Sequence, residues 1–269
     1  MNPYLEILRP LNGFIAVFAV IVTAILVGFY NPYQIILASI VVFLVSGAGM
    51  TINDYFDYKI DKINRPKRPI PSGRISRKNA LYYIIALFVI ANALAFLLNF
   101  YMFLFALFNT FITIIYSWRL KKVVLIGNFF VSWLVASSFL FASLLTEKIT
   151  ALILLLFIMA FSSNTSREIA KDIEDMKGDI KQKAKTLPIL LGKNFASYVA
   201  IFFIIFALIF SILPYLFGLL NIYYIYIVLI ADIIFIISCF LLFISVKKSQ
   251  RMMKIAMFIA IIAFLVGII

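Results

Sequence analysis

Long apolar runs alternate with short polar connections along the chain, and this pattern predicts its architecture. A helix needs about 20 apolar residues to cross a hydrocarbon core of about 30 Å. The sequence therefore predicts an all-α, polytopic membrane protein with nine transmembrane helices in a bundle, as a single domain over residues 1–269. The nine apolar runs are roughly 11–29, 33–52, 79–97, 99–116, 124–145, 149–166, 195–216, 221–244 and 252–269.

Basic residues lie almost entirely on one side of this predicted bundle. Lys148 is the exception, and the other 23 of the 24 lysines and arginines are Arg9 and residues in the alternate connections 53–78, 117–123, 167–193 and 247–254. Because cytoplasmic loops carry the excess of lysine and arginine, the N-terminus and the basic loops are predicted to be cytoplasmic.

Composition agrees with a membrane protein and narrows the choice of partners. Hydrophobic residues make up 65% of the chain, charged residues 13%, and the net charge is +13. This charge lies on short interhelical loops without a nucleic-acid-reading motif, so anionic lipid headgroups or a phosphorylated substrate are favoured over nucleic acid. No obligate protein partner is indicated. With no histidine and one cysteine, Cys239, in an apolar run, a bound metal needs oxygen ligands, which favours Mg²⁺.

Seven of the eleven acidic residues fall in two stretches that resemble each other, and Glu168 lies just before the second. NDYFDYKID at 53–61 and KDIEDMKGD at 171–179 both carry aspartates at steps of three and four, with a constant offset of 118 residues. Each stretch follows an apolar run and precedes a basic segment that contains proline. The match predicts an internal duplication, about 33–116 and 149–244.

The spacing has a chemical meaning if the helices continue through these stretches. Positions i, i+3 and i+7 then share one helix face about 10 Å long, where like charges repel one another. Bound cations remove the repulsion, and two such faces brought together across a bundle fit two Mg²⁺ ions with a diphosphate between them. The alternative is a solvated loop whose acids pair weakly with neighbouring lysines.

The two stretches resemble the aspartate-rich motifs N-D-x-x-D-x-x-x-D and D-x-x-x-D of the UbiA-type intramembrane prenyltransferases. NRPKRPIPSGRIS and KTLPILLGK, which follow the two motifs, and YSWRLK at 116–121 are also similar to segments of that family. The resemblance implies a bundle with a central cavity and cytoplasmic cap loops. It also implies a Mg²⁺-dependent transferase that moves a prenyl group from a diphosphate to an acceptor.

The resemblance further implies roles for particular residues. The magnesium ligands, or residues hydrogen-bonded to them, are Asn53, Asp54, Asp57, Asp61, Asp175 and Asp179, with Asp172 assisting. Arginine and lysine suit phosphate oxygens, and the candidates are Lys67, Arg68, Arg74, Lys121 and Lys185, with Arg65 and Arg119 less certain. Tyr116 is expected to bind the diphosphate or shape the cavity, and Arg9 and Asn12 to line the acceptor site. For each basic residue, anchoring a helix end at lipid headgroups is the alternative.

The resemblance is strongest to the archaeal ether-lipid branch of the family. It implies transfer of a geranylgeranyl group from geranylgeranyl diphosphate to the free hydroxyl of geranylgeranylglyceryl phosphate. An aromatic acceptor, such as 4-hydroxybenzoate or a menaquinone precursor, is the runner-up. An ion-coupled secondary transporter is an alternative of another class, since Asp232 lies within an apolar run. The preferred interpretation of Asp232 is a hydrogen bond between helices.

Overall fold

The structure is a computed structural model that describes residues 2–120, 123–181 and 185–268, and all regular elements within them are helices. The all-α prediction is confirmed for these residues. Two compact units form the chain and are described separately. Unit 1 comprises Met1–Leu120 and Phe141–Lys148, and unit 2 comprises Lys121–Leu140 and Ile149–Ile269.

In unit 1, the long helix α3 packs against α2, α5 and α6. Asn99 separates α5 from α6: its side chain accepts a hydrogen bond from the Met102 amide and donates one to the Leu144 carbonyl, each 2.8 Å long. The helices of this unit are α1 (Pro3–Ile7), α2 (Pro10–Leu26), α3 (Pro32–Phe56), α4 (Tyr58–Asn64), α5 (Arg77–Leu98), α6 (Phe100–Trp118) and the 3₁₀ turn η2 (Leu144–Thr146).

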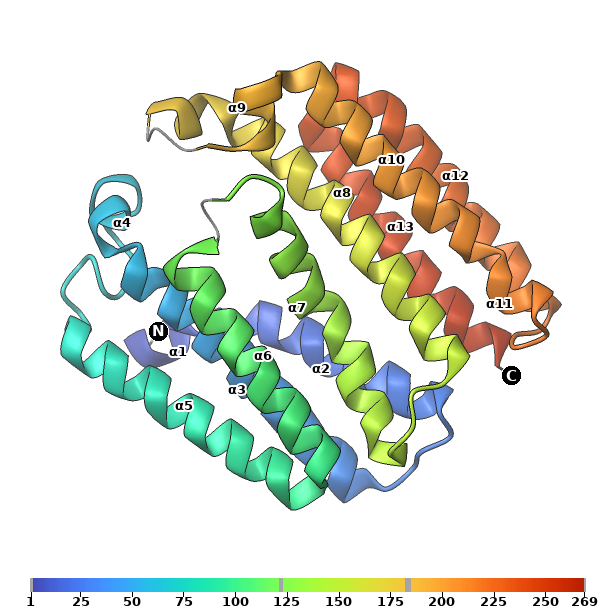
Figure 1. Cartoon of the computed structure of the whole chain (residues 1–269), viewed down its shortest axis with the longest axis horizontal. Coiled ribbons are helices and arrows are strands. Elements are labelled where there is room, and N and C mark those ends of the chain that lie inside the picture. Colours follow the sequence, from blue (N-terminus) through green and yellow to red (C-terminus); the bar gives the residue numbers. More distant parts are fainter. Residues whose placement is uncertain (1, 121–122, 182–184, 269) are drawn as a thin grey trace. The chain divides into compact units, whose positions relative to one another are not determined.

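In unit 2, α8 packs against α10 and α13, and α12 packs against α13 (Figure 1). The helices that lie in this unit, apart from the last residues of α7, are α7 (Ile126–Ser143), α8 (Ala151–Lys181), α9 (Leu187–Leu191), α10 (Lys193–Ser211), α11 (Leu213–Leu216), α12 (Ile222–Ile244) and α13 (Val246–Gly267).

Eight described helices are long and apolar enough to span a membrane. The run predicted at 11–29 forms the 17-residue α2, which is shorter than the other spans, so the count of nine stays a prediction. Several helices exceed their predicted runs at the polar end, and α8 and α13 do so by the most residues. α8 continues to Lys181, and α13 begins at Val246, because both helices extend through residues too charged to belong to an apolar run.

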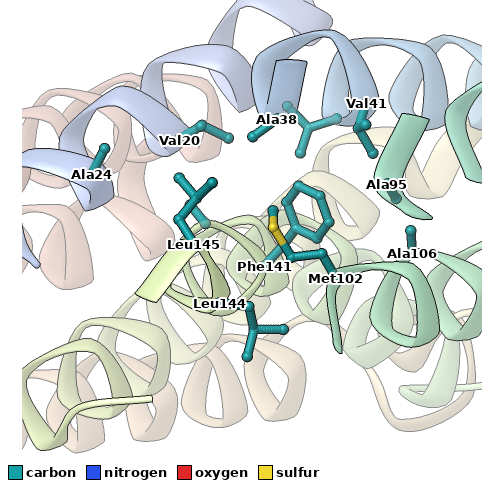
Figure 2. Packing of buried hydrophobic residues seen from close by; sticks show 12 residues of the cluster. Val20, Ala24, Ala38, Val41, Ala95, Met102, Ala106, Phe141, Leu144 and Leu145 are labelled. Carbon is teal, nitrogen blue, oxygen red and sulfur yellow. The ribbon is translucent and has the colours of Figure 1, made fainter. Parts of the chain in front are cut away.

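Small side chains fill the contacts between the helices of unit 1. Figure 2 shows Ala24, Ala38, Ala95 and Ala106 in a buried cluster with larger side chains such as Met102. Alanines at these positions let helix backbones approach closely, as is usual between membrane helices. Large apolar side chains are instead exposed at many positions of the chain, where lipid is the expected neighbour.

Asp232 has the helix-to-helix partner that the sequence predicts. Its Oδ2 atom on α12 accepts a hydrogen bond of 2.7 Å from Ser211 Oγ at the end of α10. The backbone carbonyl of Ser211 accepts a second hydrogen bond, of 2.6 Å, from the Tyr224 hydroxyl. Asp232 therefore belongs to a polar link between α10 and α12.

Gly47 allows the segment after α1 to pack closely on α3, and a larger residue there should weaken this packing. A Cβ atom at Gly47 would lie 2.8 Å from Leu8 Cδ2 and 3.3 Å from Leu8 Cβ. We expect Gly47→Val to lower the free energy of unfolding by about 1–3 kcal/mol, the usual range for overpacking, as measured by thermal unfolding in detergent. Ile40→Val on the exposed face of α3 is the control. Equal stability of both variants and wild type would contradict this packing.

Candidate active site

The first aspartate motif is divided between two helices. α3 ends at Phe56, Asp57 caps it, and α4 begins at Tyr58. Asp54 on α3 and Asp61 on α4 are both buried, with exposed fractions of 2% and 5%. The single helix face derived from the spacing is therefore wrong for this motif, because the helix ends inside it.

Arginine side chains join the two buried carboxylates of this motif. Arg68 Nη1 donates to Asp54 Oδ1 at 3.0 Å and to Asp61 Oδ2 at 2.6 Å. Arg9 Nη2 donates to the same oxygen of Asp54 at 2.5 Å. Burial lowers the pKa of Arg9 while Asp54 raises it, and a guanidinium remains charged at neutral pH. Two cations thus offset the charges of two buried anions. Removing one of these groups would leave a buried charge without its partner.

Arg9 and Asn12, both expected at the acceptor site, contact one side chain of α3. The Met50 sulfur lies 3.4 Å from Arg9 Nη1 and 3.7 Å from Asn12 Nδ2. Arg9 is therefore part of the first-motif network, whereas the Asn12 side chain is exposed beside it.

The basic loop after α4 is tied to α1. Arg74 forms a bidentate ion pair with Glu6, at 2.6 and 2.9 Å, and also donates to the Lys67 carbonyl at 2.6 Å. The hydrogen bonds with Arg74 lower the pKa of Glu6 and raise that of Arg74. An open depression of about 360 Å³ lies here, lined by Glu6, Asn64, Arg65, Pro66, Lys67 and Arg68. Arg74 thus holds the loop, while Lys67 and Arg68 border a cationic depression.

The second aspartate motif lies on one continuous helix, as the spacing predicts. α8 runs from Ala151 through the motif to Lys181, so Asp172, Asp175 and Asp179 fall within about 60° on one face. Asn128 on α7 donates a 2.8 Å hydrogen bond to Asp172 Oδ2, and Asp175 is exposed. Burial, and secondly the charge of Asp175, raise the pKa of Asp179.

A buried polar network continues from this motif toward the apolar part of α8. Asn164 Nδ2 donates to Ser132 Oγ at 3.2 Å, and its carbonyl oxygen accepts from Arg167 Nε at 3.3 Å. Arg167 also pairs with Glu168, which is 7% exposed and lies 3.6 Å from Lys171 Nζ. No sequence motif indicated the contacts made by Asn128, Asn164 or Glu168. Some of their partners lie on another helix, and the others are not part of the repeated aspartate pattern.

An apolar cavity of about 310 Å³ lies along α8 and α10. Phe161 on its wall precedes Asp175 by 14 residues, so it lies nearly four turns and about 21 Å away on the same helix face. The cavity is lined by Phe157, Ile158, Phe161, Ser162, Phe202, Phe203 and Phe206. One face of α8 thus passes from an apolar cavity wall to a line of carboxylates.

The remaining predicted residues differ in their exposure. Asn53, Asp57 and Tyr116 are half-buried, and Lys185 is exposed. Arg119 stacks over the Trp118 ring at 4.1 Å. Lys121 lies outside the described residues.

Comparison with known proteins identifies the family. Residues 13–262 match the UbiA prenyltransferase family. The chain belongs to this family. It is 44% identical to the digeranylgeranylglyceryl phosphate synthase of Methanosphaera stadtmanae over 99% of both chains. It is 41% identical to that of Methanothermobacter thermautotrophicus over 99% of this chain and 96% of the relative. This UbiA-family chain is therefore a multi-pass membrane enzyme that transfers prenyl groups.

Solved structures of the UbiA family share its fold. One, described as digeranylgeranylglyceryl phosphate synthase in membranes, has a TM-score of 0.88 at 35% identity and covers 99% of this chain and 97% of the other. A UbiA homologue from Archaeoglobus fulgidus, bound to GPP and Mg²⁺, has a TM-score of 0.75 at 20% identity and covers 99% of both chains.

The donor set of the two motifs fits a hard divalent cation. The side chains offered are carboxylates and one amide, and Arg9 and Arg68 both engage Oδ1 of Asp54, which leaves Oδ2 without a hydrogen bond among the described residues. Over that part of the chain, no three acidic or cysteine side chains form a complete metal site. Since Mg²⁺ typically binds one or two carboxylates together with water and substrate phosphate, sites with few protein ligands suit it.

Arg68 should be needed for stability, because its removal leaves Asp61 buried without an ion pair. We expect Arg68→Ala to lower the free energy of unfolding by about 3 kcal/mol, measured by thermal unfolding in detergent. Arg65→Ala, at an exposed neighbour in the same loop, is the control and should change stability little. The double variant Arg68→Ala with Asp61→Asn should recover part of the loss. Additive losses in the double variant would show that the pair is not coupled.

Proposed function

We propose that this enzyme transfers a geranylgeranyl group from geranylgeranyl diphosphate to the free hydroxyl of geranylgeranylglyceryl phosphate. The observation that carries the proposal is similarity over 99% of the chain to relatives named digeranylgeranylglyceryl phosphate synthase. The two aspartate motifs supply the chemistry that a diphosphate leaving group requires. Within unit 1, the basic depression at Lys67 and Arg68 suits a phosphate group. Within unit 2, the apolar cavity beside α8 suits a hydrocarbon chain.

The carboxylates of both motifs are proposed to hold Mg²⁺. In the first motif the ligands are Asp54, Asp57 and Asp61 with Asn53, and in the second they are Asp175 and Asp179 with Asp172. Held by these carboxylates, Mg²⁺ would neutralise diphosphate oxygens and so would make the diphosphate a better leaving group. Arg68 and Lys67 beside the first motif, and Lys185 after the second, are proposed to contact the remaining phosphate oxygens.

The reaction breaks the bond between C1 of the prenyl chain and the diphosphate oxygen. Cationic side chains fixed before the reaction stabilise the charge that develops on the departing diphosphate. The acceptor hydroxyl oxygen then forms the new bond to C1, and its proton passes to a nearby carboxylate or to the released diphosphate. Apolar side chains such as Phe161 and Phe203 hold the prenyl chain and keep water away from C1.

Orientation follows from the distribution of basic residues. We propose that the N-terminus and both motif regions face the cytoplasm. On that side, the charged diphosphate group of a prenyl diphosphate can lie in water. The positive-inside rule carries this assignment.

The acceptor assay tests the proposed function. Purified protein in detergent with Mg²⁺ and radiolabelled geranylgeranyl diphosphate should form lipid product with geranylgeranylglyceryl phosphate and none with 4-hydroxybenzoate. Asp57→Asn and Asp175→Asn should each lower kcat about 100-fold, because each removes charge stabilisation of the leaving group.

The controls of this assay separate the acceptor from the chemistry. Asp232→Asn, outside both motifs, should keep most of the activity. If product forms with the aromatic acid alone, the proposed acceptor is wrong and the proposed prenyl transfer still holds. Full activity of the Asp57→Asn and Asp175→Asn variants would overturn the assignment of the two motifs.

Asn128 should orient Asp172 for metal binding, since hydrogen bonds to ligand carboxylates fix their direction. We expect Asn128→Leu to weaken Mn²⁺ binding about 10-fold, measured by electron paramagnetic resonance titration without substrate. Asn92→Leu removes a half-buried amide in unit 1 and serves as the matched control. An unchanged affinity in Asn128→Leu would mean that Asp172 does not depend on this hydrogen bond.

A further inference from the structure

The first turns of α13 carry a concentration of positive charge that the reaction does not use. Lys247, Lys248, Arg251 and Lys254 all lie within nine residues of the helix start and all are exposed. The segment contains no acidic residue, and none of the four forms an ion pair with a described residue.

Three of these cations form a line, here named the basic strip: Lys247, Arg251 and Lys254. Their spacing of i, i+4 and i+7 places them on one helix face about 10 Å long. Like charges at this spacing destabilise a helix, and positive charge near a helix N-terminus is unfavourable as well. An anionic partner outside the helix removes both costs.

The helix face below the basic strip is apolar and exposed. Phe258 continues the same face at i+11 and is 55% exposed, and Ile255 beside it is 49% exposed. α13 is one of the helices long and apolar enough to span the membrane, so the strip lies where headgroups meet hydrocarbon. This sequence of cations followed by apolar side chains matches a phospholipid, with its phosphate followed by its chains.

One carboxylate lies beside the strip, and it is hydrogen-bonded to a neutral side chain. Glu174 on α8, near the start of α13, accepts a 2.6 Å hydrogen bond from Gln250. Elsewhere, cations at polar helix ends have aromatic partners: Arg77 lies 4.7 Å from the Tyr55 ring centre and Arg119 lies 4.1 Å from that of Trp118. The strip differs because its three cations are exposed and form no ion pair with a described residue.

We propose that the basic strip binds the headgroup phosphate of an anionic bilayer phospholipid, whose hydrocarbon chains lie along Phe258 and Ile255. The interaction is electrostatic at the headgroup, so it weakens as salt increases. It is independent of the transferase activity and of the acceptor assigned above.

The test is equilibrium binding of fluorescent phosphatidylglycerol to the purified, delipidated full chain in detergent micelles. Wild type should bind phosphatidylglycerol more tightly than phosphatidylcholine. The variant K247Q/R251Q/K254Q should bind it roughly 100-fold more weakly, since each cation near an anionic surface contributes about fivefold. The matched control K78Q/K148Q/K193Q removes the same charge from exposed lysines on three separate segments and should change binding less than threefold.

The conservative variant K247R/R251K/K254R keeps the charges and should keep the affinity, which separates charge from folding. Equal losses in the strip and control variants would overturn the proposal in favour of a net-charge effect. Equal affinity of wild type for the two lipids, or loss of affinity in the conservative variant, would also overturn it.

Discussion

The first motif depends on one constraint: a carboxylate buried among apolar helices needs a charged partner. Asp54 is 2% exposed, and an unpaired ion in such a place costs several kcal/mol. Arg9 and Arg68 provide the partners. Because Arg9 precedes α2 and Arg68 follows α4, this requirement fixes the chain segments on both sides of α3 relative to the carboxylate that the proposed chemistry uses.

Two stretches with the same aspartate spacing have different local structures. α8 continues through its motif and presents Asp172, Asp175 and Asp179 along one face, whereas α3 ends at Phe56. Their partners differ as well. Arg68 joins Asp54 to Asp61 across the helix break, while Asp172 has a neutral donor, Asn128, on a neighbouring helix. Similar spacing therefore does not imply similar geometry.

Local sequence patterns predicted most helices and the motif residues of this protein. They did not predict contacts between residues that are far apart in the sequence. Apolar length located most spans, but it missed the polar ends of α8 and α13, because these turns carry too few apolar residues. Motif chemistry indicated Asp54 and Asp61. It did not predict that Arg9 pairs with Asp54 across 45 residues, since such a contact leaves no periodic signal. The internal duplication stays a prediction.

The most direct test of the central claim is the location of a metal in the protein itself. A crystal grown with Mn²⁺ and a non-hydrolysable thiolo analogue of geranylgeranyl diphosphate would give anomalous density for each bound ion. The account predicts peaks within about 2–2.5 Å of carboxylate oxygens of the first motif and of the second. Peaks at only one motif, or at neither, would contradict the claim that both aspartate motifs bind the metal.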